Sequence, residues 1–398
     1  MAEVLYNTVP FDGLFKGKVT FLLGENGAGK SRELGRLASD FESRGVTTIA
    51  ISNTAFDRFP VKRSLHYARL TPAMGKGYVK SALRQALFNG DDERRDARQV
   101  ARTFQYAGFD EVIGVAPRLR KFDVREAMDT VIRDEKISSQ DARLIAMALE
   151  SFLVPDGDSG AGPYWRDLSG GYSDYDSRGL AAVVRNEVSL KRLRIIREVD
   201  FFLRKKEEIF PLYHASSGEL TLIAMYAFLA TRMKQGAAIL IDEPENSLHP
   251  RWQSEYCSRL FDLFHLYEPR IFLASHSPIV VSGADSGGIR TKIVNLNPVS
   301  SSSGAAIVSE GIDKSIDGIL LEAFGVLSPA SHYLSELVAE MLSDLSTRKR
   351  SLSSVLFEID QLRDRSYDRR QIEFLAGAKD LAAAVDREAG QIGGGRES

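Results

Sequence analysis

The sequence predicts an α/β fold, a mixed sheet flanked by helices, with a helical insertion and a helical C-terminal region. Residues 18–23, KVTFLL, form an apolar run that leads through a glycine-rich loop into a segment of helical periodicity. Further along, AAILI and RIFLAS are bare apolar runs of the kind that parallel sheets bury on both faces. Charged, amphipathic segments separate the first apolar run and its loop from these two later runs. These observations indicate an α/β domain that is split by a long insertion.

The first helix and the second strand follow the loop directly. Apolar residues recur at helical spacing after the loop, and VTTIAIS at residues 46–52 predicts a second strand. The apolar face of the helix consists of Leu34, Leu37, Ala38 and Phe41. The order strand, loop, helix, strand is therefore expected over residues 1–60.

The insertion, residues 61–195, is predicted to be mainly helical. DDERRDARQVARTFQYAGF and SSQDARLIAMALESFL are amphipathic helical segments, and either Ser138 or Ser139 can cap the second. Residues 155–177 are rich in Gly, Ser and Asp and predict a mobile loop. After the insertion, VDFFLRKKEEIFPLYH predicts a hairpin that turns near Lys205 and Lys206.

The chain returns to helices after about residue 310. Two apolar stripes hold helical spacing there, and the final GGGRES predicts a frayed tail. The stripes are Leu334, Leu337, Val338, Met341 and Leu345, and then Leu375, Ala378, Leu381 and Val385. The sequence contains no internal repeat.

Composition is that of an ordinary globular protein. Of the 398 residues 43% are hydrophobic and 27% charged, and the net charge of -2 gives no indication of a nucleic-acid partner. The single cysteine, Cys257, rules out an internal disulfide and is expected to be an inert, partly buried thiol. The N-terminus lacks a secretion-signal pattern, and the longest apolar run, LTLIAMYAFLA, is too short to span a bilayer. We expect a cytoplasmic protein without a membrane partner.

The loop GENGAGKS, residues 24–31, matches the full Walker A pattern. Its glycines allow backbone dihedrals that side chains forbid, so that consecutive N–H groups can surround a phosphate at a helix N-terminus. Lys30 adds a charge for the β- and γ-phosphates, and the Ser31 hydroxyl can ligate Mg²⁺. The predicted ATP-binding residues are Glu25, Asn26, Gly27, Ala28, Gly29, Lys30 and Ser31. The alternative is an incidental turn before a core helix.

Two later stretches carry candidate catalytic groups. In AAILIDEPENSLHP the strand ends in Asp242, placed to hold the Mg²⁺ shell, and Glu243, placed to polarise a water beside the γ-phosphate. His276 follows the strand RIFLAS, on the edge where doubly wound sheets bind ligands, and is a candidate γ-phosphate sensor. The alternatives are a solvated strand end and a structural histidine.

The order GENGAGKS, ASSGEL, LIDEPENSLHP and SHSP resembles an ABC-type ATPase head. It is most similar to the branch that contains RecF, the SMC heads, the OLD nucleases and the PtuA-like ATPases of bacterial antiphage systems. The resemblance covers about half of the chain, in both ATPase lobes. It implies that a signature loop begins the helix ELTLIAMYAFLATRM and contacts the γ-phosphate bound by the other protomer. The loop residues are Ser216, Ser217, Gly218 and Glu219. A serine N-cap with a Glu behind it explains them equally well locally.

The sequence departs from this branch in several places. No glutamine stands where the Q-loop is expected, and Asn53, Asp57 and Gln85 are open alternatives. No run of apolar heptads predicts a long coiled coil. The acids of a Toprim nuclease and the histidine cluster of an HNH nuclease are also missing. Any nuclease is therefore expected to be a separate protein.

A cluster of cations lies in the insertion and could neutralise nucleic-acid phosphates. Its members are Lys62, Arg63, Arg69, Lys76, Lys80, Arg84, Arg94, Arg95, Arg98, Arg102, Arg118, Arg120 and Lys121. The alternative is a solvated helical face, because acids are interleaved with them. These acids are Asp91, Asp92, Glu93 and Asp96.

The resemblance implies ATP hydrolysis to ADP and phosphate with Mg²⁺, in a homodimer or higher homo-oligomer formed through the ATPase heads. It further implies a sensor and regulator in antiphage defence, acting with a separate nuclease or toxin effector. A RecF-like DNA-repair ATPase and a scaffold with structural ATP are alternatives, and a transporter subunit is a more distant one. The predicted segments are lobe I (1–60), the insertion (61–195), lobe II (196–310) and a C-terminal assembly region (311–398).

Overall fold

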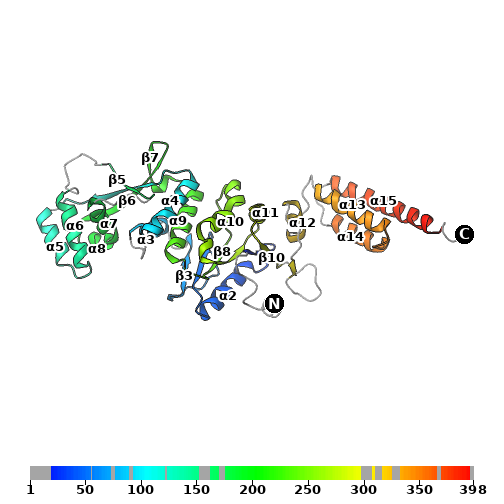
Figure 1. Ribbon diagram of the computed structural model, residues 1–398, viewed down its shortest axis with the longest axis horizontal. Coiled ribbons are helices and arrows are strands. Elements are labelled where there is room, and N and C mark those ends of the chain that lie inside the picture. The colour runs from blue at the N-terminus through cyan, green and yellow to red at the C-terminus, as the bar shows by residue number, and fades with distance from the viewer. Residues whose placement is uncertain are drawn as a thin grey trace. The chain divides into compact units, whose positions relative to one another are not determined.

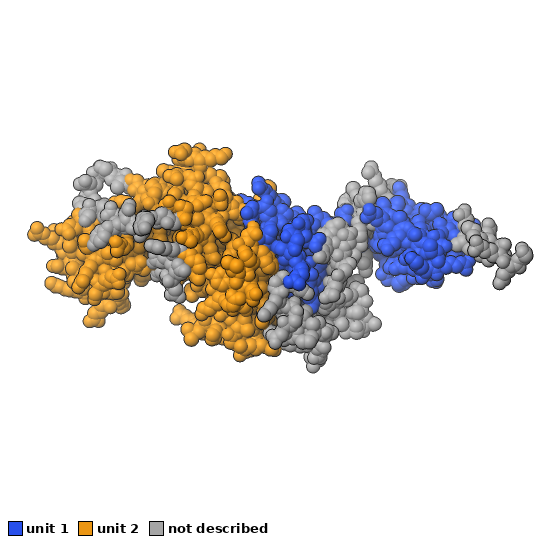
Figure 2. Space-filling view, in the orientation of Figure 1, with its two compact units in different colours: residues 1–30, 250–259, 272–398 blue, residues 31–249, 260–271 orange. Residues whose placement is uncertain are grey.

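The computed structural model describes most of the chain and divides it into two compact units. Unit 1 comprises residues 1–30, 250–259 and 272–398, and unit 2 comprises residues 31–249 and 260–271 (Figure 2). The described residues are 19–54, 56–72, 77–88, 93–121, 123–151, 162–169, 175–296, 307–309, 316–324, 332–364 and 369–394. The division into four segments that the sequence suggests stays a prediction.

The larger sheet follows the strand order β11-β10-β1-β9-β8-β2-β3 in the described part of the chain. In unit 1, β1 is parallel to β10, which pairs antiparallel with β11. In unit 2, β2 is parallel to both β8 and β3. Strands β1, β2 and β8 are buried along their whole length, in keeping with their mainly apolar sequences. The strands are β1 (Val19–Leu23), β2 (Thr48–Ser52), β3 (Tyr67–Leu70), β8 (Ala238–Asp242), β9 (Arg270–Ala274), β10 (Thr291–Asn295) and β11 (Ile307–Ser309).

A smaller antiparallel sheet in unit 2 has the order β5-β4-β6-β7. Its strands are β4 (Val112–Leu119), β5 (Tyr164–Asp167), β6 (Ile196–Lys205) and β7 (Glu208–Pro211). The hairpin of β6 and β7 turns at Lys206 and Glu207, whose φ angles of 48° and 71° are typical of the turns that match strand twist. The predicted hairpin is thus confirmed.

Helices cover the smaller sheet and the strands of the larger sheet that belong to unit 2 (Figure 1). The central one is α9, which packs against α3 and α4. Residues on all sides of α9 are buried, in keeping with its nearly unbroken apolar sequence. Helices α5 to α8 form a cluster next to the smaller sheet (Figure 1). The helices are α2 (Lys30–Ser43), α3 (Tyr78–Phe88), α4 (Glu93–Ala107), α5 (Val124–Ile132), α6 (Ser139–Ser151), α7 (Tyr175–Arg185), α8 (Glu187–Arg192) and α9 (Ser217–Arg232), with short 3₁₀ turns at η2 (Leu212–His214) and η3 (His265–Tyr267).

Unit 1 ends in a helical group with its own core. Helices α13, α14 and α15 pack on one another around buried aliphatic side chains. Most residues of the two predicted apolar stripes lie in or against this core. Leu381 is the exception at 53% exposed, so its inclusion in the second buried stripe was wrong. The helices of this region are α10 (Pro250–Phe264), α11 (Pro278–Ser286), α12 (Ile316–Phe324), α13 (His332–Ser346), α14 (Leu352–Asp364) and α15 (Arg369–Gly394).

Several local predictions are confirmed and others need correction. The predicted face of α2 is buried, and Ser138 caps α6 by accepting a hydrogen bond from the Asp141 N–H at 3.1 Å. The insertion also contains β3, β4 and β5, which the helical prediction omitted. Residues 155–177 were predicted as one loop, yet β5 and the start of α7 lie there because long-range pairing with β4 orders the strand.

Some predictions fall on parts of the chain that the structure does not describe. Residues 395–398 of the final GGGRES and the remainder of the 155–177 loop are the main ones, together with Lys76 and the side chain of Arg94. The first two glycines of that tail, Gly393 and Gly394, instead belong to α15. Cys257 is fully buried rather than partly so. No helix in the described ranges is long and apolar enough to cross a membrane.

Candidate nucleotide-binding site

The glycine-rich loop of unit 1 connects β1 to α2. Gly24, Gly27 and Gly29 have φ angles of 146°, 87° and 97°, which side-chain-bearing residues rarely adopt. A Cβ atom at Gly27 or Gly29 would meet nothing within 4 Å, so the backbone conformation rather than space requires glycine there. The Ala28 N–H closes a turn on the Glu25 carbonyl at 3.2 Å. The loop therefore has the curvature that lets backbone N–H groups surround an anion.

Lys30 is the first residue of α2 and is only 6% exposed. Its Nζ donates hydrogen bonds to the carbonyl oxygens of Gly24 at 2.7 Å and Glu25 at 3.0 Å. The ammonium group thus lies inside the curve of the loop that leads into the helix. Its charge adds to the positive potential of the helix N-terminus, which favours a bound phosphate.

Ser31 and Asp242 meet in unit 2, although 211 residues separate them in the sequence. The Ser31 hydroxyl donates a hydrogen bond to Oδ1 of Asp242 at 3.1 Å. Asp242 is the last residue of β8, is 2% exposed, and lies opposite Ser52 at the end of β2. The carboxyl ends of two parallel strands therefore deliver the acid to the start of the loop helix, which is where such sheets bind ligands.

These two residues fit a magnesium ion. A hydroxyl and a carboxylate are hard oxygen donors, and Mg²⁺ is usually held by one or two protein oxygens together with water and substrate phosphates. Ser31 and Asp242 are the residues that would hold it.

Glu243 follows Asp242 in a left-handed backbone conformation, with φ of 52°. A non-glycine residue there is uncommon and is often found at functional sites. The side-chain amide of Asn246 donates a hydrogen bond to Glu243 Oε2 at 2.6 Å. Asn246 thus orients the candidate base, a role that the sequence analysis missed. The sequence contains the relevant pattern, because the side-chain amide of Asn246 follows the acid Glu243 by three residues within the same turn.

The three alternatives for the Q-loop glutamine lie in different places. Asn53 contacts the turn after β8, since its backbone N–H donates to the Asp242 carbonyl and its amide to the Pro244 carbonyl. The Asp57 carboxylate instead accepts from Arg69 at 3.1 Å and from a backbone N–H. Gln85 lies on α3 and lines a separate cavity. Of the three, Asn53 is the one beside the candidate acids.

The predicted signature loop forms the N-terminus of α9. Ser216 is its N-cap, with Oγ accepting from the Glu219 N–H at 3.3 Å, while Glu219 Oε2 accepts from the Ser216 N–H at 2.8 Å. Lys205 also contacts the Glu219 carboxylate at 3.4 Å. This capping box is the local alternative named above, so the Glu219 side chain is engaged within its own chain. Ser216 and Ser217 are exposed and Gly218 is buried.

His276 lies in unit 1, directly after β9, and is exposed. Hydrogen bonds fix the turn around it. The Ser277 N–H donates to Ser275 Oγ at 3.0 Å, and the Ser277 hydroxyl donates to Gln253 of α10 at 2.8 Å. The neighbouring serines thus hold the backbone that carries the imidazole.

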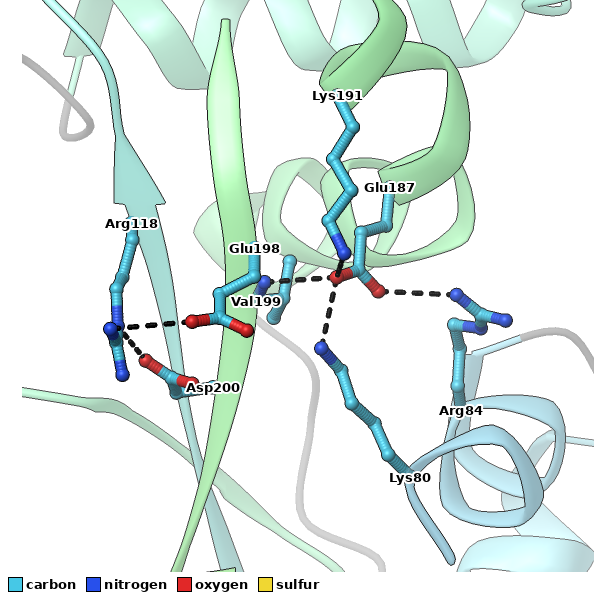
Figure 3. A network of polar contacts seen from close by, with 8 residues as sticks. All are labelled: Lys80, Arg84, Arg118, Glu187, Lys191, Glu198, Val199 and Asp200. Atoms are coloured by element: carbon cyan, nitrogen blue, oxygen red, sulfur yellow. Dashed lines mark hydrogen bonds and ion pairs between the residues drawn. The ribbon is translucent and has the colours of Figure 1, made fainter. Parts of the chain in front are cut away.

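Many cations of the insertion form ion pairs. Lys80, Arg84 and Lys191 all pair with the buried carboxylate of Glu187, at 2.9, 3.1 and 2.8 Å (Figure 3). Other pairs in the described residues are Lys62 with Glu42, Arg69 with Asp57, Arg95 with Asp96, Arg118 with Glu198 and Asp200, Arg185 with Asp141, and Arg192 with Asp134. At these positions the pairing favours the solvated, charge-balanced face over a nucleic-acid surface.

Comparison with known proteins places the chain in a family. Residues 63–282 match the model of a family described as "AAA domain, putative AbiEii toxin, Type IV TA system". The match contains Ser216–Glu219, Asp242, Glu243 and His276, whereas the glycine loop precedes it. A search of curated proteins found no match. Because the matched residues make up more than half of the chain, the protein belongs to this family of AAA-domain ATPases.

Proposed function

We propose that this protein hydrolyses ATP to ADP and phosphate at a site completed by a second copy of the chain. The observation that carries the proposal is the hydrogen bond between Ser31 and Asp242. It brings the end of the glycine loop and the end of a buried strand together, which is the arrangement that a P-loop hydrolase needs.

Each residue has a distinct part in the proposed reaction. The loop N–H groups and Lys30 bind the phosphates and counter the charge of the γ-phosphate. Glu243, oriented by Asn246, accepts a proton from the attacking water. His276 donates a hydrogen bond to the γ-phosphate. When bound by Ser31 and Asp242, Mg²⁺ would supply additional neutralisation of phosphate charge.

The second copy contributes the N-terminus of its α9. Helix α9 has 16 residues, and Ser216 and Ser217 are exposed at its start. The helix N-terminus and the Ser217 hydroxyl would stabilise negative charge that develops on a γ-phosphate bound to the other chain. The active form is therefore a homodimer or a larger homo-oligomer.

The reaction would regulate a separate nuclease or toxin in defence against phage. Support comes from the family description, which names a toxin and a toxin–antitoxin system, and from the sequence resemblance to antiphage ATPases. In this role the nucleotide state of the protein holds the effector inactive until a phage trigger arrives.

The proposal is tested with Lys30→Ala. Loss of one charge-assisted contact should weaken ATP binding by roughly 10- to 100-fold. Calorimetric titration of ATP measures this, with Lys136→Ala, an exposed lysine, as the control. In cells that carry the gene with its flanking genes, the same variant should lose protection in phage plating assays. Unchanged ATP binding by Lys30→Ala would exclude the phosphate-binding role of the loop. Absence of protection by the unmodified genes would exclude the defence role, and intact protection by the variant would exclude a part for ATP binding in it.

A further inference from the structure

A cavity lined by several cations lies in unit 2, and none of its lining residues belongs to the candidate hydrolytic site. Its volume is about 310 Å³, in the range of small-ligand sites, and it is lined by residues of β3, α3 and the end of α9. Tyr67 in its wall pairs with Thr48 at the first position of β2, whereas Asp242 pairs with Ser52 at the last. The cavity is lined along the whole of β3, and β2 lies between β3 and β8, the strand that ends in Asp242. Neighbouring strands are ~4.8 Å apart, so the cavity lies beside a strand that is ~10 Å from β8.

The cavity has an excess of positive charge. Lys62, Arg63, Arg69 and Arg232 line it, and none of the described residues in its lining is acidic. Two of the four cations are already paired outside it, Lys62 with Glu42 at 2.6 Å and Arg69 with Asp57 at 3.1 Å. Four cations minus two carboxylates leave two positive charges. In the described part of the chain, Arg63 and Arg232 form no ion pair and are exposed.

The neighbouring cavity of about 330 Å³ has a different charge balance. The cations Lys80, Arg84 and Lys191 line it, but so do three carboxylates. Figure 3 shows how these cations converge on Glu187, the buried one of the three. That network satisfies its own charges, so it offers no site for a further anion. The excess positive charge is therefore a property of the cavity of about 310 Å³ and not of the basic insertion in general.

Two buried polar atoms without a hydrogen-bond partner and two partly exposed aromatic rings also indicate a ligand site in this cavity. The Tyr67 hydroxyl and Arg69 Nε are buried without a hydrogen-bond partner, and Tyr67 is only 6% exposed. Such donors normally find an acceptor in the native state, and a bound group or water is the usual explanation. Tyr78 and Phe228 are partly exposed in the wall, and Arg232 lies over the Phe228 ring at 5.8 Å. Cations beside partly exposed rings are suited to a phosphate attached to a flat, apolar group.

We propose that this cavity binds a nucleoside phosphate that is not the hydrolysed ATP. Arg63 and Arg232 contact the phosphate, whose charge of about −2 matches the two excess positive charges, and the base lies against Tyr78 and Phe228. The Tyr67 hydroxyl and Arg69 supply donors after small side-chain adjustments. The site is independent of the proposed hydrolysis.

The test uses the full chain with Lys30→Ala, so that binding at the glycine loop is weakened. AMP is titrated, because it lacks the β- and γ-phosphates that Lys30 is predicted to contact. Binding of AMP is expected in this background, and adding Arg63→Glu and Arg232→Glu should weaken it roughly tenfold or more. Adding Arg143→Glu instead, at an exposed position of α6 that lines neither cavity, should leave it unchanged. Raising the salt concentration should also weaken the binding.

Several results would overturn the proposal. AMP binding that persists in Arg63→Glu/Arg232→Glu would place the nucleotide elsewhere, whatever the state of the glycine loop. Failure of the Lys30→Ala chain to bind AMP, or equal affinity for adenosine and AMP, would exclude a phosphate site in the cavity. Binding of a single-stranded oligonucleotide without binding of AMP would assign the surface to nucleic acid. Melting temperatures of all variants establish that they are folded.

Discussion

Glu243 combines an acidic side chain with an uncommon backbone conformation. Its φ of 52° ends strand β8 abruptly and starts the turn that contains Asn246. A left-handed residue without a compensating side-chain contact costs stability, and the 2.6 Å bond from Asn246 is such a contact. The turn therefore fixes the position of one oxygen of the carboxylate.

Replacing Glu243 with Gln should separate binding from hydrolysis. Gln keeps the shape but cannot accept the proton of the attacking water, so the rate should fall on the order of 10²- to 10⁴-fold while ATP stays bound. Phosphate release and retention of labelled ATP measure the two properties. Glu207→Gln, at the exposed hairpin turn, is the matched control. A Glu243→Gln enzyme that turns over at the normal rate would transfer the base role to another group.

Glu187 is the most heavily paired carboxylate of the described residues. Burial alone would raise its pKa, but hydrogen bonds from Lys191, Lys80 and the Val199 N–H outweigh this and lower the pKa to about 2 from an ordinary value of 4.5. The side chain is 3% exposed, so screening by water is weak. The ionised carboxylate holds α3, α8 and β6 together (Figure 3).

Glu187→Gln should therefore destabilise unit 2 by about 3 kcal/mol at neutral pH, because cations whose side chains are 16%, 27% and 42% exposed lose their buried carboxylate partner. The effect depends on pH in a defined direction. A carboxylate with a lowered pKa stabilises the folded state fully above pH 4.5, and this contribution is lost as the pH falls toward 2. Urea unfolding midpoints of the native chain and the variant should accordingly converge over that range. Glu198→Gln, which removes an exposed pair with Arg118, should change them by at most about 1 kcal/mol. A gap that stays constant down to pH 2 would contradict the assigned pKa.

At the level of elements, the contact between α10 and α11 depends on one glycine. A Cβ at Gly283 would lie 2.0 Å from the carbonyl oxygen of Ser254, a backbone atom that cannot move aside without shifting the helix. Gly287, near the end of the same helix, would place its Cβ no closer than 3.4 Å to any atom. The two positions are therefore a natural pair for comparison.

Gly283→Ala should destabilise unit 1 by about 1–3 kcal/mol or more, as overpacking does in well-packed interiors. Gly287→Ala should have a much smaller effect. Thermal unfolding monitored by circular dichroism gives the comparison. Equal melting temperatures for the two variants would mean that the helices separate at little cost.

Elements with strong local signals could be predicted, and those ordered by distant partners could not. The buried face of α2, the β6–β7 hairpin and the cap of α6 follow from residues within one segment. Strand β4 was missed because it contains Gly114 and Pro117, which weaken any strand pattern. Gly114 is needed because a Cβ there would lie 3.0 Å or less from Pro163 and Phe202, far away in sequence.

The same distinction applies to the candidate site. The Walker A spacing predicted Lys30 and Ser31 as site residues, and the strand end predicted Asp242, because each motif is contiguous. The supporting contacts of Asn53 and Asn246 depend on how the turns fold, which the sequence does not specify. Asp57 was a plausible candidate from its position in the sequence, but its carboxylate accepts a hydrogen bond from Arg69.

At the scale of the whole molecule, the signature loop requires a second chain for its proposed role. The structure shows which residue of this loop can be substituted to test that role. Ser216 caps α9 and Gly218 is buried, so substitutions there would also disturb the helix. Ser217 is exposed at the first helical position, and Ser217→Arg can block the contact with the partner while the fold is kept.

Mixing two inactive variants tests whether the sites are shared. Ser217→Arg should bind ATP without hydrolysing it, and so should Glu243→Gln. In their heterodimer one site combines an intact Glu243 with an intact Ser217 from the partner, so an equal mixture should regain about a quarter of normal activity if the assembly is a two-fold dimer. Phosphate release is measured after fluorescence shows that subunits have exchanged. Continued inactivity would argue that the sites are not shared or that both must react together.

The burial of Cys257 in α10 has a consequence for labelling chemistry. It is the single cysteine of the chain, its side chain is inaccessible, and burial raises the pKa of its thiol. The thiolate is the nucleophile that reacts with thiol reagents, and the buried side chain of Cys257 neither ionises readily nor meets the reagent in the folded chain. A cysteine introduced at an exposed position would therefore carry a dye or spin label alone, with the native residue left in place. The slow modification of Cys257 itself would then record how often the helix opens.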